Sequence, residues 1–257
     1  MQRFKLTISY VGTRFCGWQR QTRRRNGIIQ PELRTVQSEL ENLASRIAGQ
    51  KVIIHASGRT DTGVHAEAQV AHMDVPKSKA DINWIRAFNT QLPDDVAISA
   101  IEPVDSDFHA QYSARSKLYA YSLWMSYNYT PPRLRPFVWS CGPLNLELMQ
   151  EAARCLLGRH DFASFRNTGV DYNSTVRTLT KAELAPPDPA QPLLATWHFE
   201  ADGFLKQMVR NVMGLLAEVG RGKLPPEAAV EILAAKDRTR SPATAPACGL
   251  TLVRVDY

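Results

Sequence analysis

Strict alternation of apolar and polar side chains opens the chain and predicts a strand at 3–10 with one buried face. Its apolar members are Phe4, Leu6, Ile8 and Tyr10. A helical repeat follows from Thr35 until Gly49 ends it, and its apolar positions are Val36, Leu40, Leu43 and Ile47. Apolar runs predict further strands at 52–56, 66–75 and 96–101, and Asp81 can cap a helix between the last two.

The order of these elements, strand–helix–strand–strand–helix–strand, is that of a split βαβ or ferredoxin-like domain. The second half shows a similar order without repeating the sequence. Its predicted elements are a strand at 117–124, a helix from Leu146 to Gly158, strands near Arg177 and Trp197, a helix from Leu205, a helix from Pro225 to Lys236 and a strand at 251–256. We therefore predict an α+β protein of two domains, residues 1–107 and residues 108–257.

Composition indicates an ordinary globular protein, because 44% of the 257 residues are hydrophobic and 22% are charged. No window approaches the ~18 apolar residues of a membrane span, and the first residues lack the apolar core of a secretory signal. The four cysteines are scattered without a Cys-x-x-Cys pair, which indicates neither a disulfide framework nor a zinc site. We expect a cytoplasmic protein that does not contact membranes.

Positive charge is concentrated at the beginning of the chain. The formal net charge is +6, and residues 1–60 hold eleven Lys and Arg against three Glu, a balance of +8. The centre is a basic segment, residues 20–25. The cations and rings in and around it are Arg14, Phe15, Trp18, Arg20, Arg23, Arg24, Arg25 and Arg34. Cations mixed with stackable rings are typical of nucleic-acid surfaces, although a solvated loop has the same composition.

One carboxylate stands in a loop between two predicted strands. Asp61 lies between Thr60 and Thr62, with Gly58 and Gly63 close by, shortly after an apolar run. A chain presents a single functional acid at a strand end in this way. A turn whose Asp bonds its own backbone gives the same pattern, so both interpretations stay open at this stage.

Several other chemistries lack their motifs. No second carboxylate lies close to Asp61 in the sequence, as a local acid pair would need, and no Gly-x-Ser-x-Gly elbow occurs. The six histidines show no metal-ligand spacing such as His-x-x-x-His. Gly12 and Gly17 have the spacing that opens a phosphate loop, but Trp18-Gln19 stands where Lys-Ser/Thr is needed.

Two later segments carry side chains of interest. Alternation places Lys117, Tyr119 and Tyr121 on one face of a strand, where the rings either serve a site or simply cover the sheet. In the helix from Leu205, Arg210 lies roughly 140° from Leu205 and off the apolar stripe. This position fits either a site residue or an exposed surface arginine.

The run from Gly58 to Ala66 resembles the signature of the TruA family of tRNA pseudouridine synthases. Matching segments continue in family order along nearly the whole chain. They are Gly17-Trp18-Gln19-Arg20, Val36-Gln37, Phe108-His109-Ala110, Lys117-x-Tyr119-x-Tyr121, His160-Asp161-Phe162-x-Ser164-Phe165, Met208-Val209-Arg210-Asn211 and Ala235-Lys236-Asp237-Arg238. Each match is weak alone, and together they are specific.

The resemblance implies the pseudouridine synthase fold, in which two ferredoxin-like halves form an extended, largely antiparallel central sheet with flanking helices. It also implies a homodimer that acts on the anticodon stem-loop of tRNA. The implied reaction converts uridine to pseudouridine at nucleotides 38, 39 and/or 40, with no cofactor and no metal. This reaction cleaves the bond from C1′ to N1, turns the bound uracil and joins C1′ to C5.

By the same resemblance, four residues serve the chemistry. Asp61 is the nucleophile or anionic stabiliser beside the sugar, and Arg210 is the cation paired with it. Arg59 helps to flip the nucleotide out of its stack, and Tyr119 lies against the flipped base, where its phenol is a candidate to take the C5 proton. We expect RNA contacts from Arg14, Trp18, Arg20, Arg23, Arg24, Arg25, His65 and Lys117.

Two departures from the family pattern affect substrate choice. The segment at 21–33 is longer and more basic than usual, and Lys206-Gln207 stands where the family often has aromatic or histidine residues.

Two rival classes of function are less well supported than a synthase. A catalytically silent RNA-binding protein has no need of Asp61, Tyr119 and Arg210 together, and a carboxylate-dependent hydrolase or phosphotransferase finds no metal cluster or phosphate loop here.

Overall fold

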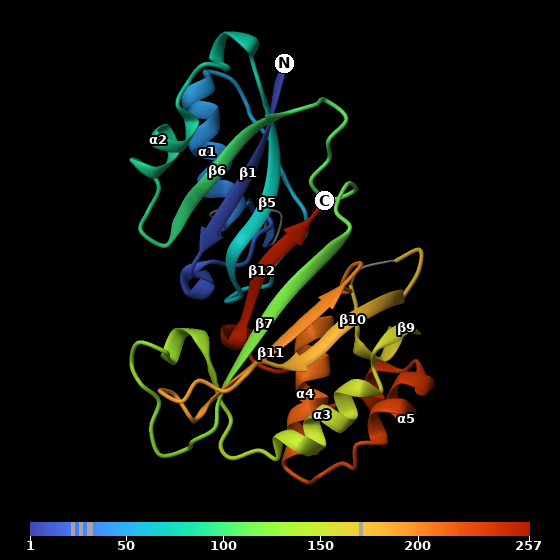
Figure 1. The fold of residues 1–257 in the computed structure, drawn as a ribbon. Coiled ribbons are helices and arrows are strands. Elements are labelled where there is room, and N and C mark those ends of the chain that lie inside the picture. Colours follow the sequence, from blue (N-terminus) through green and yellow to red (C-terminus); the bar gives the residue numbers. More distant parts are fainter. Residues whose placement is uncertain (22–23, 26–27, 30–32, 170–171) are drawn as a thin grey trace. The chain divides into compact units, whose positions relative to one another are not determined.

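The structure, a computed structural model, describes residues 1–21, 24–25, 28–29, 33–169 and 172–257 (Figure 1). The chain divides into two compact units. Unit 1 consists of Met1–Ala114 and Leu252–Tyr257, and unit 2 consists of Arg115–Thr251. The division therefore lies at 114/115 rather than at the expected 107/108, and the end of the chain returns to the first unit.

Unit 1 has its elements in the predicted order (Figure 1). They are β1 Gln2–Tyr10, α1 Val36–Ala48, β4 Ile54–Ala56, β5 His65–Val75, α2 Trp84–Asn89, β6 Val96–Val104 and the last residues of β12 Leu250–Asp256, with 3-10 helices at Gly12–Arg14 and Lys77–Lys79. The strand order is β6-β1-β5-β12, and β4 also pairs with β5. β1 is antiparallel to β5 and β6, and β4 is antiparallel to β5. The split βαβ arrangement and the α+β class are thereby confirmed for this unit.

Burial follows the sequence pattern where a strand has one covered face. On β1 the alternating apolar residues Phe4, Leu6, Ile8 and Tyr10 are all buried, as predicted. On β5, in contrast, most of the 11 residues are buried, including consecutive ones that point to opposite faces of the strand. A strand buried on both faces does not alternate in the sequence.

Local capping sets the helix ends of unit 1. Thr35 Oγ1 accepts from Ser38 N at 3.2 Å while Ser38 Oγ accepts from Thr35 N at 3.1 Å, so α1 begins with a capping box. Gly49, with φ +71°, ends α1 as predicted. For α2 the predicted cap, Asp81, is wrong. The helix begins only at Trp84, and the side chain of Asn83 accepts from the backbone of its first turn.

Unit 2 combines a group of antiparallel strands with three helices. Its elements are β7 Ser116–Trp124, β8 Trp139–Ser140, α3 Leu146–Arg154, β9 Gly158–Asp161, β10 Val176–Leu184, β11 Leu194–Ala201, α4 Met208–Gly220 and α5 Ala228–Ala235, with 3-10 helices at Arg135–Phe137, Ala163–Phe165, Arg238–Arg240 and Ala247–Gly249. The strand order is β7-β11-β10-β9, with antiparallel neighbours, and β8 pairs with β7 in parallel. α3 and α4 pack against each other (Figure 1). Across the described residues of both units, no helix has the length and apolarity needed to cross a membrane.

Two helix ends in unit 2 differ from the prediction. α3 stops at Arg154, and Gly158, with φ +100°, opens β9 instead of closing the helix. α4 starts at Met208 rather than Leu205, because Gln207 has φ +62° and this conformation interrupts the helical backbone. β8 and β9 contain 2 and 4 residues, too few for a periodic signal in the sequence.

Candidate active site

The predicted catalytic acid lies in unit 1 on the acid loop, residues 57–64, between β4 and β5. Asp61 is partly exposed, and Arg59 is exposed. Asp61 O accepts from Val64 N at 3.1 Å, and Gly63 adopts φ +81°, so the chain turns directly after the acid. The two interpretations of the sequence, a backbone turn and a presented acid, therefore both describe this loop.

Buried polar side chains hold the acid loop in place. Ser57 Oγ donates to Gln69 Oε1 at 2.7 Å, and Gln69 Nε2 donates to Gly58 O at 2.9 Å. Further along the loop, Tyr10 OH and Thr60 Oγ1 share a hydrogen bond of 2.8 Å. Burial raises the pKa of Tyr10 to about 12, so its hydroxyl stays protonated at neutral pH. The backbone that leads to the acid is thus fixed at several points.

Two glycines near the start of the chain allow a close approach to the acid loop. A Cβ on Gly17 would lie 2.7 Å from Thr60 O, and a Cβ on Gly12 would lie 2.0 Å from Val64 O. Both distances are too short for a side chain, and Trp18 N donates to Thr60 O at 3.0 Å across this approach. The glycine spacing that resembles a phosphate loop in the sequence therefore serves backbone packing.

Two of the residues expected to contact RNA have side chains that lie inside unit 1. Trp18 is 1% exposed, and its ring centroid lies 6.3 Å from that of Tyr10. His65 is 2% exposed, and its Nδ1 accepts from Gly12 N at 3.0 Å. Phe15 is also buried. These rings belong to the core beneath the acid loop, and residue type alone does not separate a core ring from a stacking surface.

Acids from other elements pair with the cations around the basic segment. Asp95, which is buried, accepts from Arg14 Nε at 2.9 Å and from Arg34 Nη2 at 2.7 Å. Hydrogen bonds from Arg34 are the main cause that lowers the pKa of Asp95. Arg20 Nη1 lies 3.5 Å from Glu41 Oε2. The local charge balance of the sequence misses these pairs, because Asp95 is 61 positions from Arg34.

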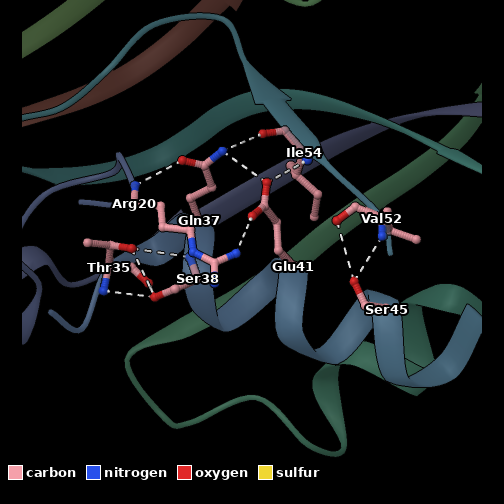
Figure 2. Close-up of polar contacts among 8 residues, drawn as sticks. All are labelled: Arg20, Thr35, Gln37, Ser38, Glu41, Ser45, Val52 and Ile54. Carbon is pink, nitrogen blue, oxygen red and sulfur yellow. Dashed lines mark hydrogen bonds and ion pairs between the residues drawn. The ribbon is translucent and has the colours of Figure 1, made fainter. Parts of the chain in front are cut away.

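Figure 2 shows how α1 connects the basic segment to the strand that enters the acid loop. Gln37 Oε1 accepts from Arg20 N at 2.9 Å, and Gln37 Nε2 donates to Ile54 O at 3.1 Å. Glu41 Oε1 accepts from Gln37 Nε2 at 3.0 Å and from Ile54 N at 2.9 Å. Gln37 and Glu41 are both buried. Their i, i+4 spacing on an otherwise apolar helix face is the sequence signal that could have identified them.

The remaining predicted contacts of the basic segment lie in a short hairpin. Arg24–Arg25 forms β2, which pairs antiparallel with β3, Ile28–Ile29. Arg23 lies outside the described residues. The predicted loop thus contains two strands of two residues each, too short to predict from periodicity.

The other two predicted catalytic residues lie in unit 2. Tyr119 on β7 is 8% exposed, and its ring meets that of Phe204 edge-on with centroids 5.1 Å apart. Arg210 on α4 is partly exposed, and its Nε donates to Ala245 O at 2.8 Å. Arg210 is therefore anchored to the protein, unlike a simple surface arginine.

Lys117 lies on the same strand as Tyr119 and is partly exposed. Burial and, to a smaller extent, the positive charge of Arg177 lower the pKa of Lys117 to about 8. The Lys117 ammonium group therefore begins to lose its proton at slightly alkaline pH. A phosphate contact by this side chain would restore the charged form.

The described part of the chain, with its gaps at 22–23, 26–27, 30–32 and 170–171, holds no group of three or more His, Cys, Asp or Glu side chains that could bind a metal ion. Three histidines do gather in unit 1, where the rings of His55 and His72 are stacked and that of His109 meets His72 edge-on. The ring centroid of His72 lies 5.1 Å from that of His55 and 4.7 Å from that of His109.

Comparison with known proteins identifies the family. A sequence profile of the family described as tRNA pseudouridine synthase matches residues 6–113 and 152–257. The chain belongs to this family. A tRNA pseudouridine synthase A of Nitratidesulfovibrio vulgaris is 54% identical over 281 aligned residues, which cover 100% of both chains. Proteins of the same name from Lawsonia intracellularis and Geobacillus kaustophilus are 50% and 42% identical, with 100% of this chain and 100% and 95% of their own lengths covered.

Membership of the pseudouridine synthase family confirms the TruA resemblance and the isomerase class. The structure adds that family motifs distant in sequence meet within each unit. In unit 1, the segments around Trp18 and Gln37 contact the acid loop and β4. In unit 2, Asn211 Nδ2 donates to Phe165 O at 2.7 Å, and Arg238 Nη2 donates to Asn211 Oδ1 at 3.1 Å.

Proposed function

We propose that this protein isomerises uridine to pseudouridine in the anticodon arm of tRNA, at positions 38, 39 and/or 40, as a homodimer without a cofactor. The observation that carries the proposal is the acid loop. In a member of the tRNA pseudouridine synthase family, it presents Asp61 within the family signature, on a backbone anchored by Ser57, Gln69, Tyr10 and Trp18.

The reaction is an isomerisation in which all atoms are retained. The C1′–N1 bond breaks, the uracil turns while bound, and the C1′–C5 bond forms. C5 loses a proton and N1 gains one, so the net composition is unchanged. Asp61 either attacks C1′ directly or acts through a glycal intermediate, and both routes need an ionised carboxylate beside the sugar.

The other residues serve access and orientation. We assign Arg59, which is exposed beside Asp61, to bracing the stack after the target nucleotide is flipped, a step that costs a few kcal/mol. Arg210 holds the Asp61 carboxylate in the catalytic complex, and Tyr119 lies against the flipped base. Phosphate contacts fall to Lys117 and to the cations of the N-terminal region, namely Arg14, Arg20, Arg23, Arg24 and Arg25.

The test is to map pseudouridine in tRNA from cells with and without this protein. We expect loss of the modification at one or more of positions 38, 39 and 40, and its return with the wild-type gene. Asp61→Asn preserves size and should not restore it, although tRNA binding stays within about threefold. Asp94→Asn, at an exposed acid of the same unit, is the matched control and should restore it. Unchanged modification in the deletion strain, or Asp61→Asn activity within about tenfold of wild type, would contradict the proposal.

A further inference from the structure

A short segment of unit 2, which we call the strap, residues 241–246, runs along α4 beside Arg210. Ala245 N donates to Arg210 O at 3.1 Å, and Arg210 Nε donates to Ala245 O at 2.8 Å. The two hydrogen bonds run in opposite directions between the same two residues. The strap therefore sets both the backbone position of Arg210 and the orientation of its planar guanidinium group.

The next carbonyl of the strap reaches the strand that carries Tyr119. Tyr121 OH donates to Pro246 O at 2.7 Å, and Tyr121 is fully buried on β7. Burial raises the pKa of Tyr121 well above its usual value, so the phenol remains a donor at neutral pH. Consecutive carbonyls, those of Ala245 and Pro246, thus connect the strap to α4 and to β7.

One arginine holds the beginning of the strap. Arg238 Nη1 donates to Ser241 O at 2.9 Å and to Pro242 O at 3.1 Å. Its Nη2 donates to Thr244 Oγ1 at 3.0 Å and to Asn211 Oδ1 at 3.1 Å. Thr244 Oγ1 in turn donates to Asn211 Oδ1 at 2.7 Å. Because Asn211 follows Arg210 on α4, this network holds the strap at the helix position next to the proposed catalytic arginine.

Glycine on α4 allows the strap to lie this close. A Cβ on Gly214, one turn after Arg210, would be 2.1 Å from Ala243 O. A glycine inside a helix costs about 1 kcal/mol relative to alanine. The cost is offset here by the close approach of the strap, which no other residue type permits.

We propose that Arg238, Asn211, Thr244 and Gly214 are positioning residues for the isomerisation. They hold the strap so that the Ala245 carbonyl orients the Arg210 guanidinium toward its catalytic direction. The inference rests on the role proposed above for Arg210. A displacement of about 1 Å in a catalytic group can cost about a hundredfold in rate, so small movements of the strap are sufficient to matter.

Two substitutions disturb the strap by different means. Thr244→Val removes the hydroxyl between Arg238 and Asn211 at nearly constant volume, and Gly214→Ala forces the strap away from α4. Gly203→Ala is the matched control, because a Cβ there meets only Arg177 atoms at 3.5 Å or more. We expect kcat on tRNA to fall by about tenfold to a hundredfold in both strap variants with KM within about twofold, and to be unchanged in the control. Lower thermal stability with unchanged kcat would show a purely structural role and overturn the proposal.

A double-mutant comparison tests whether the effect passes through Arg210. In the Arg210→Lys background the Nε donor is absent, so Thr244→Val should change the single-turnover rate by less than about twofold. The same fold-loss in both backgrounds would overturn the proposal.

A second measurement does not depend on turnover. The ¹⁵N–¹H signal of Arg210 Nε, assigned by its loss in Arg210→Lys, should exchange with solvent at least about tenfold faster in both strap variants than in wild type and Gly203→Ala. An unchanged signal in the strap variants would overturn the positioning role. If wild-type protein forms no pseudouridine while this signal responds as expected, the proposed function fails and the link from the strap to Arg210 stands.

Discussion

His72 of β5 shows how burial changes the chemistry of one residue in unit 1. The side chain is 3% exposed, and its Nδ1 accepts from Ala110 N at 3.1 Å. Burial lowers the pKa of His72 to about 4, helped by the nearby positive charge of Arg3 and by His109 and His55, while Asp74 acts in the opposite direction. The residue is therefore a neutral acceptor in the folded protein at physiological pH.

The pH dependence of stability follows from this pKa. An unfolded His72 binds a proton near pH 6.5 and the folded one near 4, so the unfolded state binds more protons between these values. The free energy of unfolding should fall as pH decreases from about 6.5 to about 4. His72→Asn keeps an acceptor near the Nδ1 position without titrating, so urea unfolding across this window should show a shallower slope than wild type. Identical slopes in the two proteins would contradict the assignment.

At the scale of elements, the β2–β3 hairpin and its flanks concentrate arginines at one place in the chain. Arg23, Arg24 and Arg25 are adjacent, so they cannot each read a separate base, and the sequence has no acid between Arg14 and Glu32. Asp95 and Glu41 pair with Arg34 and Arg20 at the flanks. Phosphate contact is therefore the expected task of the three consecutive arginines.

Replacing Arg23, Arg24 and Arg25 with Ala should weaken the binding of all tRNAs alike. The slope of log affinity against log salt should become shallower by up to about one unit for each phosphate that the variant no longer neutralises, with turnover of bound substrate little changed. Filter binding at several salt concentrations measures this. Lys77→Ala with Lys79→Ala, on a separate 3-10 helix of unit 1, is the control for loss of charge alone. Unchanged affinity and slope in the triple variant would show a hairpin without an RNA role, and a changed choice of uridine would show that it sets register.

At the scale of the whole molecule, the two units are not separate stretches of sequence. Residues Leu252–Tyr257 belong to unit 1, where β12 neighbours β5 in the strand order. Tyr257 OH donates to Ala110 O at 2.8 Å, and its ring centroid lies 5.0 Å from that of Phe108. The end of the chain therefore completes the unit that its beginning starts.

Truncation after Thr251 should destabilise unit 1 although its N-terminal sequence is intact. Removing the buried side chains of Leu252 and Val255 should cost about 3 kcal/mol or more, whereas Tyr257→Phe, which removes one hydrogen bond, should cost about 1 kcal/mol. Hydrogen exchange of the β5 amides measures the difference. Unaltered protection of β5 in the truncated chain would show that the C-terminal strand is dispensable for the unit.

The sequence by itself determined the features that depend on neighbouring residues. The alternation of β1 and the cap-to-cap pattern of α1, from Thr35 to Gly49, are local properties, and the structure has both within one residue of the predicted bounds. The family also followed from the sequence, because the signature around Asp61 is one continuous run. The predicted cap at Asp81 failed because Asn83, a second capping residue two positions later, accepts from Arg86 N and starts the helix there.

Only the tertiary structure decided which of these residues face the solvent and which pair with distant partners. Trp18 and His65 have the composition of an RNA surface but lie in the core. Asp95 neutralises cations that lie 61 or more positions away. Position 214 requires glycine only because the strap lies against α4. Each of these facts depends on which distant segments meet. Packing and long-range hydrogen bonds determine these tertiary contacts, and no pattern along the chain encodes them directly.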